Sequence, residues 1–227
     1  MSINLADCIT AVAGIGTAAV ALVDSSKIVR GGISNCGFHH IMRVITVFFP
    51  VNSAPSPALD LVGVRAALRA NWLNGTPLTE QKKLARSLIT LRLDGVNAAH
   101  LAEVTGVDPA ILSTAADKYR IGKPLDKRES AVINRFDLIV AALLDEGYLQ
   151  ADQTYRNSAK VCAASISILL ATLGGWLLSS GAYWGTADMG IAIMAGILAT
   201  PLAPVAKDIS RAVTAGARIL SQAVKTI

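Results

Sequence analysis

Charged residues are scarce in this chain, and their distribution excludes several kinds of protein. Only 16% of the 227 residues are Asp, Glu, Lys or Arg, against about a quarter in an ordinary soluble domain. Between Lys160 and Lys207 the only charged residue is Asp188. A chain of this size is too small to cover two helices that are so uniformly apolar, so we interpret this stretch as membrane-embedded.

Cysteines and catalytic motifs are also sparse. Cys8, Cys36 and Cys162 have no metal-like spacing and form an odd set, so we expect reduced thiols. No phosphate-binding loop, dinucleotide-binding glycine fingerprint, nucleophile elbow or zinc spacing is present. His39 and His40 are adjacent, and adjacent side chains on a helix point about 100° apart, which does not suit a metal site. We therefore expect no enzymatic activity, metal or cofactor.

Long apolar runs, in contrast, are abundant. Residues 3–23, 161–178 and 189–205 each approach the ~20 apolar residues that cross a bilayer. We therefore predict an all-α integral membrane protein with about three transmembrane helices. The first run has two alternatives: it lies at the membrane interface, or it is a signal peptide cleaved near Ala21. We favour an uncleaved anchor, because the basic segment that begins such a signal is missing.

The positions of Lys and Arg predict the orientation. None lies in residues 1–26 or 179–188; all lie between Lys27 and Lys160 or from Lys207 onward. Since basic loops stay in the cytoplasm, we expect residues 27–160 and the C-terminus inside. We expect a multi-pass protein of a bacterial inner membrane.

Turn and cap residues divide the chain further. Asp108 and Asp126 are expected to cap helices, and Gly106 and Gly147 to follow helix ends. The soluble helices are expected at residues 59–73, 80–93, 98–105, 109–119 and 127–145. The predicted parts are a transmembrane helix (1–26), an interfacial helix with a Pro-rich linker (27–57), a cytoplasmic helical domain (58–157), a transmembrane hairpin (158–206) and an amphipathic helix (207–227).

Small residues recur at every fourth position of the hairpin. Such stripes let another helix backbone approach closely, and helices associate in lipid by that kind of packing. We expect packing within the chain or with other subunits, in a homo-oligomer or a mixed membrane complex. The predicted packing residues are Ala163, Ser167, Ala171, Gly175 and Ser179, then Ala192, Gly196 and Thr200.

Two segments are expected to lie on the lipid surface. Residues 37–51 are too short to cross and can place their apolar side chains on one helical face. The C-terminal helix combines an apolar stripe with basic residues, which suits anionic lipid or a protein surface. The predicted interface residues are Phe38, Arg43, Phe48, Phe49, Arg211 and Arg218.

One stretch, LAEVTGVDPAILS (residues 101–113), resembles a helix-turn-helix motif, over about residues 97–119. The resemblance implies that the second helix reads the DNA major groove. However, Asp108 and Asp117 would repel phosphate, so we expect a protein-interaction module rather than a nucleic-acid contact. The candidate contacts are Ser113, Thr114, Lys118 and Arg120.

These features predict a non-enzymatic scaffold subunit of a membrane-associated assembly, which packs through small-residue helices and recruits a cytosolic partner. One alternative is a membrane-tethered DNA-binding regulator. Another is a pore or transporter subunit, but such proteins usually carry ionisable residues near the bilayer middle. Here Asp7 and Asp188 fall close to the outer interface of the expected topology.

The orientation can be tested by thiol labelling of whole cells. A cysteine placed at Ala182 should react with a membrane-impermeant reagent, and one placed at Ala115 should not, because basic residues hold residues 27–160 inside. Labelling at Ala115 would contradict the predicted topology.

Overall fold

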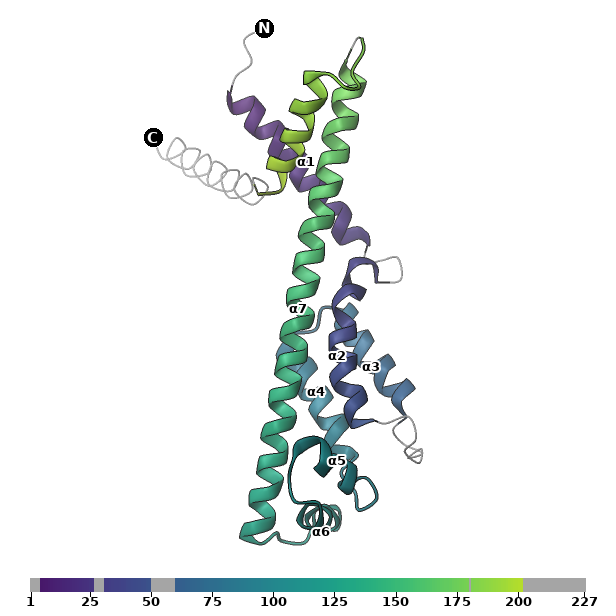
Figure 1. Cartoon of the computed structure of the whole chain (residues 1–227), viewed down its shortest axis with the longest axis vertical. Helices are drawn as coiled ribbons and strands as arrows, with labels where there is room; N and C mark the ends of the chain where they lie inside the picture. The colour runs from purple at the N-terminus through teal and green to yellow at the C-terminus, as the bar shows by residue number, and fades with distance from the viewer. Residues whose placement is uncertain (1–4, 27–30, 50–59, 180, 202–227) are drawn as a thin grey trace, which may run out of the picture. The chain divides into compact units, whose positions relative to one another are not determined.

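The structure is a computed structural model that describes residues 5–26, 31–49, 60–179 and 181–201. Every regular element in these ranges is helical (Figure 1), so the all-α prediction is confirmed. The chain forms two compact units. We call Ser34–Arg156 the helical unit, and Met1–Ile33 together with Asn157–Ile227 the apolar unit. The linker at 52–58 and the C-terminal helix, with Arg211 and Arg218, lie outside the described residues.

The elements follow the cap and turn signals closely. In the apolar unit lie α1 (Leu5–Ser26), the C-terminal part of α7 (Lys127–Leu178) and a further helix, Ala187–Pro201; the short η1 (Gly32–Ser34) lies at the boundary. The helical unit contains α2 (Asn35–Phe48), α3 (Leu61–Leu73), α4 (Leu78–Leu91), α5 (Ala98–Thr105), α6 (Pro109–Arg120) and the N-terminal part of α7.

Helix α7 does not end where the sequence predicted. It begins as expected, because Asp126 and Glu129 bond to each other's backbone N–H groups at 2.8 Å. Gly147, however, lies inside the helix and not after its end. A Cβ there would lie 2.7 Å from Val44 Cγ2, so this glycine permits α2 and α7 to approach closely. One helix of 52 residues therefore belongs to both units.

The core of the helical unit includes the residues predicted for a membrane surface. Phe38, Phe48 and Phe49 are each at most 6% exposed, whereas Arg43 lies in solvent. The apolar face of α2 packs against the unit's other helices, so these phenylalanines are not accessible to lipid. The largest fully buried side chains are Tyr148, Phe48, Phe49, Phe136, Ile41, Ile45, Leu68, Ile89, Leu101, Leu112, Leu144 and Val140.

The first and last residues of the helical unit lie at the same end of it. Trp72, at the end of α3, donates its indole N–H to the carbonyl of Ser34 at 2.6 Å. Its ring also meets that of Tyr155 edge-on, with 6.3 Å between centroids. Both connections to the apolar unit therefore leave from one end of the helical unit.

Among the described helices, two are long and apolar enough to cross a bilayer. They are α1, over Cys8–Ser26, and α7. The apolar helix Ala187–Pro201 is shorter than a span in the described part of the chain. The three-span count is therefore not confirmed and stays a prediction.

His40 lies where α2 packs on α7. Its Nε2 lies 3.0 Å from the Thr154 hydroxyl, while its Nδ1 is buried without a partner. Burial lowers the pKa of His40 from its ordinary value, and the charges of His39 and Arg43 lower it further. The folded state therefore binds this proton less readily than the unfolded state.

We expect the chain to lose stability as the pH falls through the ordinary histidine range, because the unfolded state then binds more protons. The unfolding temperature of the full chain in detergent, followed by circular dichroism, should decrease between about pH 7.5 and about pH 5. His40→Gln should flatten this dependence, whereas His100→Gln should retain it. An unchanged slope in His40→Gln would contradict the assignment.

Candidate functional site

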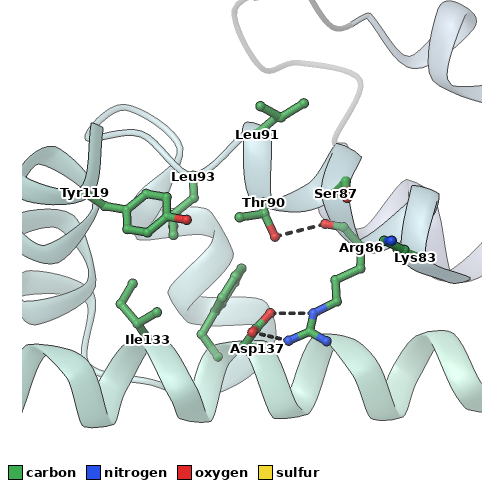
Figure 2. Close-up of a pocket in the computed structure, with 10 residues that line it drawn as sticks. Lys83, Arg86, Ser87, Thr90, Leu91, Leu93, Tyr119, Ile133 and Asp137 are labelled. Atoms are coloured by element: carbon green, nitrogen blue, oxygen red, sulfur yellow. Dashed lines mark hydrogen bonds and ion pairs between the residues drawn. The ribbon is translucent and has the colours of Figure 1, made fainter. Parts of the chain in front are cut away.

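A groove opens on the helical unit between α4, α6 and α7 (Figure 2). Its volume is about 540 Å³, within the range of ligand and peptide sites. Apolar side chains line it together with a polar set from α4. The lining residues are Lys83, Arg86, Ser87, Thr90, Leu91, Leu93, Tyr119, Ile133, Phe136 and Asp137.

The groove combines a buried floor with exposed apolar edges. Phe136 is 1% exposed and Leu93 is 9% exposed, so both are fixed by the core. Leu91 and Tyr119, in contrast, are 69% and 63% exposed. Large apolar side chains that flank a groove and remain in solvent are typical of a protein interaction surface.

Two ion pairs join α4 to α7 beside this groove. The Arg86 guanidinium binds both carboxylate oxygens of Asp137, with Nε to Oδ1 at 2.8 Å (Figure 2). This bidentate contact raises the pKa of Arg86. Lys82 binds Asp145 at 2.7 Å. Asp137 and Asp145 of α7 are therefore occupied within the chain.

A third ion pair joins α6 to α7. Lys118 Nζ lies 2.6 Å from a carboxylate oxygen of Glu129, whose side chain is only 7% exposed. Removing Lys118 would leave a nearly buried carboxylate without its counter-ion, which costs more than losing a surface pair. The sequence predicted Lys118 as a possible contact with a partner. In the structure its ammonium group forms an ion pair with Glu129 that holds α6 on α7.

A second groove of about 550 Å³ lies between α2 and α3. Phe38 contributes to it along with Met42, Leu61 and exposed Val62. Its cations include Arg65 and Arg69, and the Arg69 guanidinium donates to the Asn35 side chain at 3.0 Å. This groove offers a comparison surface on the same unit.

Helices α5 and α6 and their turn lie where the motif resemblance placed them. Gly106 adopts φ +64° and its N–H donates to the Ala102 carbonyl, which ends α5. Asp108 then accepts from two backbone N–H groups at the start of α6. Leu101 and Leu112 are fully buried between the helices. The pair is therefore an integral part of the core.

The exposed face of α6 offers little to nucleic acid. Thr114 bonds to the Ala110 carbonyl in its own helix, and Ser113 is half-buried. Arg120 is exposed, but so are Asp108 and Asp117. With Lys118 neutralised by Glu129, the exposed carboxylates disfavour a phosphate contact.

The predicted packing stripe of α7 faces the chain's own hairpin. Ser167 is buried and lies 3.4 Å, oxygen to oxygen, from Thr200. A Cβ at Gly196 would lie 2.5 Å from the Ile168 Cα, and one at Gly175 would lie 2.5 Å from the Tyr183 hydroxyl oxygen. The other predicted positions are buried Ala163 and Ala171, and half-buried Ser179 and Ala192.

Among the described residues, no group of three His, Cys, Asp or Glu could hold a metal ion. No family model, curated protein or solved structure matches the chain. The groove of α4, α6 and α7 was not found by sequence reasoning, since it forms only where three helices meet. One signal was available: Lys83, Arg86, Ser87 and Thr90 recur with helical spacing on one face of α4.

The turn between α5 and α6 should contribute more to the stability of the chain than the charges beside it. Gly106→Val should lower the unfolding free energy of the full chain by about 1–3 kcal/mol, because a β-branched residue is strained at positive φ. Arg120→Ala should change it by less than about 0.5 kcal/mol. Denaturant unfolding in detergent measures both. Equal effects would show that the turn geometry is not a constraint.

Proposed function

We propose that this chain is a non-enzymatic, membrane-embedded scaffold subunit whose helical unit recruits a cytosolic protein. One observation carries the proposal: α7 contributes to the core of the helical unit and continues as an apolar helix. No loop interrupts it. A protein bound to the helical unit would therefore be joined to the membrane by hydrogen-bonded helix.

Exposed apolar side chains support a membrane position. Val161, Leu169, Leu177 and Leu178 of α7 are 61–90% exposed, although large contiguous apolar surfaces are rare on soluble monomers. On the neighbouring helix Ile191 is 67% exposed. Because small residues pack inside the hairpin, these larger residues are left to contact lipid or another subunit.

The finer topology belongs to the same proposal: three spans in a bacterial inner membrane, with the helical unit in the cytoplasm. The labelling test of this topology needs a better inside position, because Ala115 is fully buried. Thr114 is exposed on the same helix and replaces it. Cys8 and Cys36 are exposed and must first be changed to serine.

A DNA-binding regulator is the second candidate, favoured only by the geometry of α5 and α6. Fluorescence anisotropy with duplex DNA separates it from the scaffold, using the full chain in detergent at physiological salt. We expect no sequence-specific binding, because exposed Asp108 and Asp117 repel phosphate. A salt-steep affinity that Arg120→Ala weakens would reverse this ranking.

Co-purification in mild detergent tests the scaffold proposal. The wild-type chain should resist alkaline extraction from membranes. After purification, native mass spectrometry should show an assembly heavier than the 23.6 kDa of one chain. Gly196→Leu should separate the two helices of the chain's own hairpin, because a side chain there collides with the α7 backbone, and the assembly built on that hairpin should be lost with it.

Gly190→Leu is the matched control, since a Cβ at Gly190 meets nothing within 4 Å. It lies on the same helix and adds the same side chain, so it should insert and assemble like the wild type. A wild-type chain that is extracted at alkaline pH, or that runs as a lone monomer, would contradict the proposed function.

A further inference from the structure

The lining of the groove of α4, α6 and α7 carries one positive charge, Lys83, that no ion pair among the described residues offsets. Glu129, Asp137 and Asp145 are each held in an ion pair within the chain. Exposed Glu80, Asp117 and Asp126 remain as negative charges on the elements that form the groove. Among the described residues, Lys83 of the lining lies outside every ion pair, as do four exposed cations at the end of α6, in the turn after it and at the start of α7: Arg120, Lys123, Lys127 and Arg128.

The apolar part of the groove fits the contact face of a helix. Its apolar lining combines Leu93, Ile133 and Phe136 with the exposed side chains of Leu91 and Tyr119, and Figure 2 shows Leu93 between Leu91 and Tyr119. An amphipathic helix presents large side chains at positions i, i+3, i+4 and i+7, and it binds by inserting them into a groove of this kind. The volume of about 540 Å³ is sufficient for a few such side chains.

We propose that this groove binds an acidic amphipathic helix of a protein partner. Apolar anchors would enter the floor, and carboxylates would face Lys83 and the basic residues that follow Tyr119. Complementary charge governs the encounter rate and excludes wrong partners. The inference rests on the proposed scaffold function and specifies the chemistry of the recruited protein.

Charge also argues against two other occupants. The chain's own C-terminal segment carries Lys207, Arg211, Arg218 and Lys225 against a single acid, Asp208. Such a segment would be repelled by the exposed cations on the elements that form the groove. A second copy of this groove would present the same positive charge.

Site-specific photo-crosslinking in the native cells tests the proposal on the full chain. A photoreactive phenylalanine analogue is placed at Leu91 or Tyr119, and at Val62 on the second groove for comparison. The crosslinked segment is then mapped by mass spectrometry. We expect Leu91 and Tyr119 to capture one protein through a segment rich in Asp and Glu with helical apolar spacing.

Charge reversal supplies the second readout. Lys83→Glu should lower the crosslink yield at Leu91 about fivefold or more, because it places like charges together. Arg65→Glu, the matched reversal on the second groove, should leave it within about twofold. A yield that is insensitive to Lys83→Glu would overturn the inference, as would capture of residues 207–227 or of a second copy.

The same experiment separates this inference from the scaffold function. Capture of a protein at Val62 but not at Leu91 or Tyr119 would overturn the groove assignment and leave recruitment by the helical unit intact. A captured segment that is basic or uncharged would also overturn it. Absence of any crosslinked protein at all three positions would contradict both.

Discussion

The continuity of α7 is the constraint on which the rest of the structure depends. A helix interior satisfies each backbone N–H with the carbonyl four residues earlier, so the chain needs no turn between the soluble core and the apolar stretch. Its N-terminal half supplies Phe136, Val140, Leu144 and Tyr148 to the core of the helical unit. Its C-terminal half packs on the helix Ala187–Pro201 through Ser167. Both units are therefore built on one element.

Contacts along α7 differ in kind between the two units. In the helical unit, aromatic and aliphatic side chains pack against it, and ion pairs with Lys82, Arg86 and Lys118 hold α4 and α6. In the apolar unit, close backbone approach at Gly196 takes the place of large side chains. This difference is consistent with the proposed membrane position of the apolar unit, since water drives apolar burial and lipid does not.

Sequence patterns predicted the local structure well. The end of α5 follows from Gly106 at positive φ, and the starts of α6 and α7 follow from Asp108 and Asp126, whose side chains accept from backbone N–H groups. Sequence patterns predicted the wrong structure where contacts between distant segments of the chain determine it. Gly147 was predicted to follow a helix end, but it lies inside α7, where a side chain of α2 is so close that a Cβ would collide with it. The apolar face of α2 read as membrane-facing, because periodicity does not distinguish a lipid surface from a protein core.

The candidate groove could not have been derived from sequence for the same reason. Lys118 and Arg120 are close in sequence and both positively charged, yet Lys118 pairs with a buried carboxylate of α7 and Arg120 faces solvent. Only the packing of α6 on α7 decides which charge remains available to a partner. The exposed edges Leu91 and Tyr119 likewise come together only through the fold.

The continuity of α7 can be measured directly by pulsed electron spin resonance on the full chain in nanodiscs. Spin labels at Leu138 and Val161, which are 71% and 67% exposed, lie on opposite sides of the unit boundary. At a helical rise of 1.5 Å per residue their backbones are about 35 Å apart. A single narrow distance distribution near that value is expected. A broad distribution, or a much shorter mean distance, would show that α7 is broken between the units and would contradict the account.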